Sequence, residues 1–220
     1  MKALATLVLL LATSLGAPGA ARAGTIVDGV GDAVAVFGEP GPLLDIDTLT
    51  VTPSGGDLLV SVTFHTPILP ASSEAANSLF GGLDFDFDRD PLTGDPPFQN
   101  NFPAFAQLEF GSELSVDFFF EGENPGFVGV YDNLSHTLIG TVPVTFTESG
   151  VSYDLPMSLT TISGPFYVTA GFGTSAQPTD AMDVFGVVPE PAPLVLLELG
   201  IAVLGGAHLV SWRSARDARS

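Results

Sequence analysis

The chain has 220 residues, of which 45% are hydrophobic and 14% charged, and its 25 acidic against 6 basic residues give a formal net charge of -19. So acidic a chain cannot neutralise phosphates, which excludes a nucleic-acid-binding protein, while its 17 Phe supply apolar surface for a core, which excludes a disordered acidic tail. The absence of Cys excludes disulfides, thiolate metal sites and a lipid anchor on Cys.

Residues 1–23 have the three parts of a secretory signal peptide. Met1 and Lys2 form a short positive start, an apolar run follows from Ala3, and residues 21–23 (Ala-Arg-Ala) form a cleavage site of the small-x-small type. We therefore expect export, with a mature chain that begins near Gly24. The alternative interpretation is an apolar N-terminal helix that belongs to the fold.

Residues 24–187 form the predicted body of the protein, a single domain. They contain 22 acidic residues and one base, Arg89, so the formal charge of this part is -21. Like charges in this number repel one another unless cations gather on them. Because hard divalent ions prefer carboxylate oxygens, Ca²⁺ is the expected cofactor.

The hydropathy pattern predicts strands along the whole body. Apolar residues recur at every second position from Leu58 to Phe64, and a turn-type sequence, residues 53–57, separates this strand from an earlier one that starts at Ile46. Gly, Pro, Asn and Asp punctuate the further candidate strands, and short helices are expected at residues 72–79 and 157–162. Many short strands with frequent turns predict an all-β fold, an antiparallel β-sandwich. The further candidate strands are residues 82–88, 105–110, 114–120, 126–131, 138–147, 151–155, 166–173 and 183–187.

The densest group of acids lies in residues 83–95. In a strand, Asp84, Asp86 and Asp88 project from one face, with about 6.5 to 7 Å between neighbours. The turn that follows returns Asp90 and Asp95, so these five carboxylates are candidate calcium ligands. The segment lacks the glycine and the final glutamate of an EF-hand. The alternative is a solvated acidic edge that discourages aggregation between strands.

A second group of acids, Asp28, Asp32 and Asp45, flanks the first predicted strand. These residues are also candidate calcium ligands. Ordinary turn chemistry, in which Asp side chains accept hydrogen bonds from nearby backbone amides, is the alternative.

The arrangement of these acids resembles that of a known group of domains. Asp28-x-x-Gly-Asp32, a short loop, Asp45-Ile46 and two alternating strands resemble the opening of sandwich domains related to family 9 carbohydrate-binding modules and the DOMON-like group. Residues 86–94 and 178–180 resemble later parts of the same domains. The resemblance implies a jelly-roll-like sandwich with structural calcium and, in some members, a sugar-binding face.

Catalytic motifs are scarce, and we predict that the protein is not an enzyme. The body has two histidines, His65 and His136, and neither accompanies a G-x-S-x-G elbow or a histidine pair with metal spacing. A secreted hydrolase with paired carboxylates is the least favoured alternative. Phe119 and Tyr131 are the aromatic residues expected to face outwards, but the only Trp, Trp212, lies near the C-terminus, which weakens a sugar-binding interpretation.

The last part of the chain predicts a membrane anchor. A proline-rich linker, residues 188–193, is followed by the apolar segment 194–212, which as a helix would span roughly 28 Å, close to the thickness of a bilayer core. Glu198 and His208 interrupt this transmembrane segment, and a buried core helix is the alternative. The positive-inside rule places the tail, residues 213–220, in the cytoplasm, because it carries Arg213, Arg216 and Arg219.

The order of these three parts resembles the PEP-CTERM sorting signal of Gram-negative bacteria. Pro189, Glu190 and Pro191 hold the backbone extended and form its PEP motif, before the apolar helix and the Arg-rich end. The resemblance implies recognition by an exosortase-type membrane transpeptidase. The precursor would then be anchored in the inner membrane, and the product would be delivered to the periplasm, the cell surface or an exopolysaccharide matrix.

We therefore predict a non-enzymatic exported surface or biofilm-matrix protein with a calcium-stabilised body. The alternative from another class is a carbohydrate-binding module that acts on the cell's own exopolysaccharide.

Overall fold

The computed structural model describes residues 23–33, 43–105, 107–162, 164–174, 177–182 and 186–188, all of which belong to one compact unit, Ala21–Glu190. The predicted signal peptide (except Ala23), PEP motif, membrane helix and Arg-rich tail lie outside the described residues. Within the described ranges, no helix is long and apolar enough to cross a membrane.

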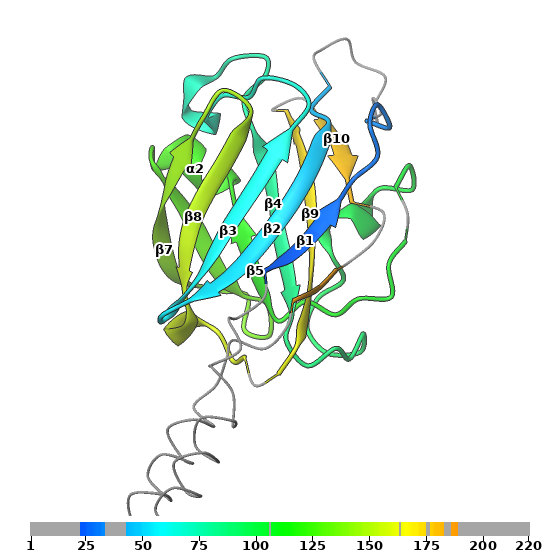
Figure 1. Ribbon diagram of the computed structural model, residues 1–220, viewed down its shortest axis with the longest axis vertical. Coiled ribbons are helices and arrows are strands. Elements are labelled where there is room, and N and C mark those ends of the chain that lie inside the picture. Colours follow the sequence, from blue (N-terminus) through cyan, green and yellow to red (C-terminus); the bar gives the residue numbers. More distant parts are fainter. Residues whose placement is uncertain are drawn as a thin grey trace, which may run out of the picture. The chain divides into compact units, whose positions relative to one another are not determined.

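The described part of the chain is an all-β domain in which every pair of strands is antiparallel, as the hydropathy pattern predicts (Figure 1). The turn at residues 53–57 is confirmed, because Ser54 pairs with Asp57 and Gly55 has a positive φ of 67°. The strands are β1 (Gly24–Val27), β2 (Ile46–Ser54), β3 (Asp57–Phe64), β4 (Phe80–Asp86), β5 (Leu114–Asp117), β6 (Phe127–Asp132), β7 (Thr137–Phe146), β8 (Gly150–Pro156), β9 (Phe166–Thr174), β10 (Gln177–Ala181) and β11 (Gly186–Val188).

The strands form one continuous sheet that curls over on itself. Their order is β1-β2-β3-β8-β7-β6-β5-β4-β9-β10, and β11 also pairs with β9. Strand β7 joins the two halves, because residues 137–143 pair with β6 and residues 144–146 pair with β8. In Figure 1, β1, β2, β3 and β8 lie in front of β4, β5 and β9.

The core fills the space between the two halves of the sheet. Phe64 of β3 lies against Phe172 of β9, with ring centroids 5.5 Å apart, and Phe118 packs edge-on against both Phe172 and Tyr153. These aromatic contacts belong to one buried apolar cluster that takes residues from each of the strands β1 to β9 and from β11, with Val142 as the contribution of β7. Burial of this cluster is the main stabilising term of the domain.

The outer face of the β4 half is covered by segments that the sequence did not predict correctly. Residues 107–110 form no strand, so the strand predicted at 105–110 is wrong over the part that is described. The preceding 3-10 helix η2 (Phe98–Asn101) packs on β4 and β9 instead, where the buried Gln99 donates to the carbonyl of Met182 at 2.6 Å. This cover removes the outward-facing acids of β4 from solvent.

The helices of the described residues are short. The predicted strand 114–120 ends at Asp117 and is followed by helix α2 (Phe119–Glu123). In place of the predicted helices 72–79 and 157–162 there are only the 3-10 turns η1 (Ala71–Ser73) and η3 (Met157–Leu159).

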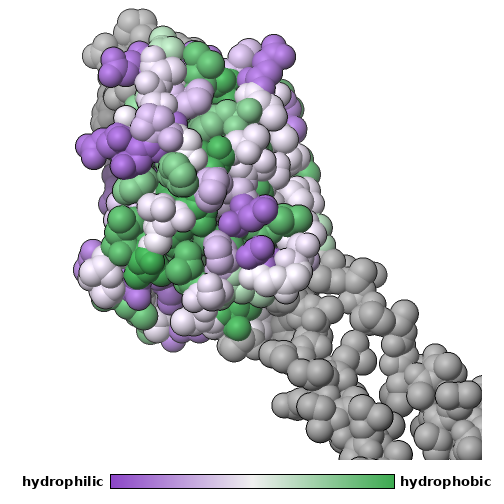
Figure 2. Space-filling model, turned by 90° about the vertical axis from the view of Figure 1, so that its left-hand side faces the viewer, coloured by the Kyte–Doolittle hydropathy of each residue, from purple (hydrophilic) through white to green (hydrophobic). Residues whose placement is uncertain are grey.

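On the side where β7 lies, hydrophobic patches alternate with polar side chains (Figure 2). Exposed apolar residues of β7 and the turn before it are Leu134, Leu138 and Ile139.

Candidate metal centre and binding groove

Three acids from distant parts of the chain meet at one end of the curled sheet. Asp28 and Asp32 follow β1, and Asp180 lies in β10; one carboxylate oxygen from each lies within 4.8 Å of the others. Asp28 and Asp180 are buried, whereas Asp32 is exposed. We call this set the first acidic group.

Asp45, just before β2, lies beside the first acidic group. Its Oδ2 accepts a hydrogen bond from the amide of Gly31 at 2.9 Å, and its charge contributes to the raised pKa of Asp180. Burial is the largest cause of that shift, which brings the pKa of Asp180 to about 7, and the charges of Asp28 and Asp32 add to it. The four carboxylates therefore repel one another when all are ionised.

The residues present fit a calcium ion. Two oxygens that bind one Ca²⁺ ion are at most about 4.6 to 5.2 Å apart, since each lies 2.3 to 2.6 Å from it, and the oxygens of the first acidic group lie within 4.8 Å of one another. Oδ1 of Asp45 is buried and has no hydrogen-bond partner. A buried carboxylate oxygen without a donor is costly, and a cation would remove that cost.

Glu121 shows what a buried acid looks like when the protein itself supplies the donors. Its side chain is 2% exposed, and it accepts hydrogen bonds from the amide and hydroxyl of Ser72 and from the amide of Gly126 at 2.8 to 3.0 Å. Glu121 is therefore a structural carboxylate whose oxygens the protein itself satisfies. Asp45 differs from it, because Oδ1 of Asp45 has no donor and could accept a cation.

A second acidic group consists of Asp86, Asp88 and Glu113, whose oxygens also lie within 4.8 Å of one another. The hydroxyl of Thr93 sits among them, at 2.8 Å from Glu113 Oε1 and 3.0 Å from both oxygens of Asp88. A hydroxyl has one proton to donate, so most of these oxygen pairs have no proton between them. Either a protonated carboxyl or a cation would relieve this arrangement.

The surroundings of the second acidic group disfavour the ionised form of two of its carboxyls, as their raised pKa values show. Burial raises the pKa of Asp86 and of Glu113, and the charge of Asp88 raises both further. The amide of Arg89 donates to Asp86 and the amide of Phe87 donates to Glu113 at 2.6 Å, which opposes the shift.

The other acids predicted as metal ligands lie outside both groups. Asp84 accepts hydrogen bonds from Ser115 Oγ and from the amide of Phe98, and burial raises its pKa. Asp90 is exposed and accepts from the amide of Leu92 at 3.0 Å, while Asp95 faces His136.

The alternative of a solvated acidic edge fails for part of this cluster. Asp84 is 6% exposed and Asp86 is 1% exposed, because η2 and the segment before β5 cover them. Among the five candidate acids of this segment, Asp88 and Asp90 are exposed.

Sequence reasoning missed two members of the acidic groups. Asp180 lies in a segment that carries the family resemblance but is not among the predicted ligands, and Glu113 lies 25 residues after Asp88, outside the acidic segment 83–95. Strand pairing places both residues. Glu113 lies just before β5, which pairs with β4, and Asp180 lies in β10, which pairs with β9 beside β4.

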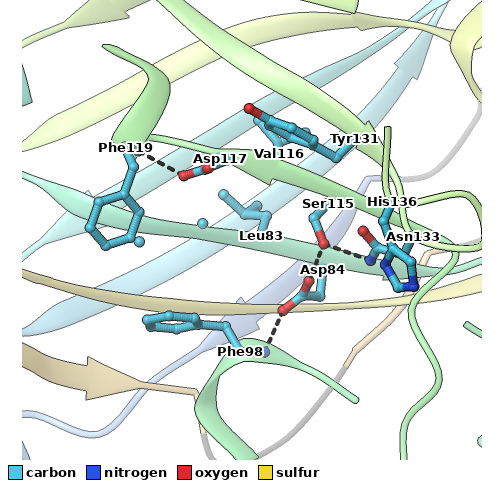
Figure 3. A pocket seen from close by; sticks show the side chains of 12 residues that line it. Leu83, Asp84, Phe98, Ser115, Val116, Asp117, Phe119, Tyr131, Asn133 and His136 are labelled. Atoms are coloured by element: carbon cyan, nitrogen blue, oxygen red, sulfur yellow. Dashed lines mark hydrogen bonds between the residues drawn. The ribbon is translucent and has the colours of Figure 1, made fainter. Parts of the chain in front are cut away.

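A groove of about 350 Å³ opens on the outer face of β4, β5 and β6 (Figure 3). Phe119, which is 48% exposed, and Tyr131 both line it, so the prediction that these two aromatic residues face outwards is confirmed. The lining residues are Gly81, Gly82, Leu83, Asp84, Phe98, Ser115, Val116, Asp117, Phe119, Tyr131, Asn133 and His136.

The polar part of the groove is held by a hydrogen-bond chain. Ser115 Oγ donates to Asp84 at 2.5 Å and accepts from Asn133 Nδ2 at 2.7 Å, and Nδ1 of His136 lies 3.2 Å from Asp95. Burial raises the pKa of Asp117, whose oxygen accepts the amide of Phe119 at 2.7 Å. These contacts fix carboxyl, hydroxyl and amide groups beside aromatic rings.

Neither a protein-family model nor a curated protein matches this chain.

Proposed function

We propose that the chain is an exported, non-enzymatic surface or matrix protein whose body, a jelly-roll-like sandwich, is stabilised by bound calcium. The observation that supports the calcium part most is the first acidic group with Asp45 beside it, because its carboxylates come from three separate segments and Oδ1 of Asp45 has no donor. A cation there would connect β1, β2 and β10 at one point. The second acidic group is the other proposed site.

The calcium proposal is tested by melting curves of the chelator-treated protein. Ca²⁺ at millimolar concentration should raise the Tm, and Mg²⁺ should do less, because it gives up its water reluctantly. If general screening of a strongly acidic domain were the cause, NaCl at matched ionic strength would stabilise the protein as well as CaCl₂ does. Equal responses to all three salts would exclude a specific site.

The sorting proposal rests on the three-part C-terminal sequence. An exosortase-type transpeptidase would act at the PEP motif of the membrane-anchored precursor, and the mature protein would reach the periplasm, the cell surface or the matrix. Intact-mass measurement of the surface fraction tests this proposal. The expected product ends near Glu190 to Pro193 and lacks Trp212, whereas a dominant species that retains Arg219 would show a permanent anchor.

Carbohydrate binding is the second candidate function, and the groove over β4, β5 and β6 is the observation that favours it. Aromatic rings beside hydrogen-bonding groups suit the apolar faces and hydroxyls of a sugar. A glycan array probed with the full chain is the first test. Binding that is lost in Phe119→Ala would support this candidate, and an absence of binding to any glycan would reject it.

A further inference from the structure

The groove has an aromatic part and a polar part. Phe98 and Phe119 form the aromatic part, with ring centroids 6.5 Å apart and ring planes at 60° to each other (Figure 3). Gly81 and Gly82 of strand β4 also line the groove, and glycine is required there because a Cβ would lie 2.2 Å from the carbonyl oxygen of Gly171 or 2.5 Å from that of Val116. Both aromatic side chains line the same groove, where a bound ligand can contact them.

The polar part carries carboxyl groups that have no Lys or Arg beside them among the residues that the structure describes. Arg89 is the only Lys or Arg among the described residues, and its guanidinium lies 5.9 Å from the centroid of the Tyr167 ring, which is not part of the groove. His136, the other basic group at the groove, faces Asp95. Asp84 and Asp117 are thus left to acceptor contacts with neutral donors.

We propose that the groove binds an amino sugar, a pyranose unit with a free ammonium group, within a polysaccharide. The apolar face of the pyranose would lie on Phe119, and the ammonium group would face Asp117, the partly exposed carboxylate beside that ring. This inference rests on the second candidate function and names its ligand class. It does not depend on calcium.

Charge decides between sugar classes. A uronic acid would bring a carboxylate towards Asp117, in a domain whose formal charge is already -21, so it is disfavoured. A neutral sugar would make the aromatic contact but leave the carboxyls without a cation. An ammonium group supplies the missing charge and, near an aromatic face, adds a cation–π contribution.

The experiment is isothermal titration of the full chain, in mild detergent, with four probes of equal length: oligomers of glucosamine, N-acetylglucosamine, galacturonic acid and lysine. We expect the glucosamine oligomer to bind most tightly and the galacturonic acid oligomer not to bind. Phe119→Ala should weaken glucosamine binding by roughly tenfold, which corresponds to about 1.4 kcal/mol. Phe127→Ala, which removes a 44% exposed Phe outside the groove, should leave it unchanged.

Asp117→Asn tests the charge. Asn keeps an oxygen that can accept the amide of Phe119, and Asp154→Asn on β8 is the matched control because that residue is exposed and outside the groove. Asp117→Asn should weaken binding of the glucosamine oligomer but not of the N-acetylated oligomer. If the variant does not fold, added NaCl should have the same selective effect on the wild-type chain.

Each other outcome overturns a defined part of the inference. Equal affinity for the glucosamine and N-acetylglucosamine oligomers, with no effect of Asp117→Asn or of salt, would reject the amino-sugar class and leave carbohydrate binding intact. Binding of the lysine oligomer that depends on Phe119 to the same degree would replace the sugar by a cationic peptide. No binding of any of the sugar oligomers would reject the inference together with the second candidate function.

Discussion

Asp180 Oδ2 accepts a hydrogen bond from the backbone amide of Ile46 at 2.6 Å, across 134 residues of sequence. Oδ1 of the same side chain accepts from the amide of Ala181 at 3.0 Å. Asp180 therefore joins the start of β2 to β10 and also belongs to the first acidic group. A cation held by this group would strengthen a connection that the side chain of Asp180 already makes.

Asp180→Asn should remove most of the calcium response at this site. The amide oxygen can still accept from Ile46, but Asn offers an ion no negative charge. An ion that binds only the folded state stabilises it by about 2.7 kcal/mol at a hundredfold excess over Kd, and thermal unfolding with and without calcium measures this gain. Asp154→Asn, an exposed change on β8, should retain the full gain. A gain of the same size in both variants would place the ion elsewhere.

The calcium-free protein should lose stability as the pH rises from about 4 to about 7. The pKa of Asp180 is near its ordinary 3.8 in the unfolded chain and about 7 in the folded one, so between these values the folded state holds a proton that the unfolded state has lost. Burial raises the pKa of Asp84, Asp86 and Glu113 as well, which adds to the same trend. Urea unfolding across this range measures the slope.

Calcium should flatten that slope, because the ion replaces the proton as the partner of the ionised carboxyls. Asp180→Asn should flatten it too, without calcium. A stability that rises from pH 4 to pH 7 in chelator would contradict the raised pKa values.

Glu113→Gln tests the second acidic group. The amide retains an oxygen near Thr93 and removes a desolvated charge, so the calcium-free protein should become more stable at neutral pH, while the number of bound calcium ions should fall by one. Calorimetric stoichiometry and melting in chelator give the two values. An unchanged stoichiometry would mean that Glu113 accepts a proton rather than binding an ion.

Glu121→Ala should destabilise the domain by about 1 to 3 kcal/mol, because it leaves the amide of Ser72 and the amide of Gly126 without their acceptor. The calcium response should persist, since Glu121 belongs to neither acidic group. Loss of that response in Glu121→Ala would indicate that the response reports general stability instead of a site.

Local sequence patterns predicted most of the fold because each predicted strand depends on its own alternation. Leu58 to Phe64 and Phe166 to Gly173 form strands β3 and β9 as expected. Segment 105–110 was predicted wrongly because its Phe residues belong to a loop, in which Phe105 packs against Phe102 and Phe110 is buried. Apolar residues in such a loop have no period that distinguishes them from a short strand.

The candidate sites were harder to predict because they depend on pairings between distant strands. Asp86 and Asp88 were found by their density, but Glu113 joins them only through the pairing of β4 with β5. Asp84 lies on the same face of β4 but belongs to neither acidic group, because its oxygens accept hydrogen bonds from Ser115 Oγ and from the amide of Phe98 in η2. The groove likewise needed the positions of Phe98 and Phe119, which come from two segments not predicted as helical.

The most direct test of the calcium proposal is a crystal structure of the protein grown in a calcium-containing solution, with anomalous diffraction data. We expect an anomalous peak with oxygens of Asp28, Asp32 and Asp180 at about 2.3 to 2.6 Å, the distance range of calcium ligands. A well-ordered first acidic group without such a peak, at calcium concentrations that raise the Tm, would contradict it.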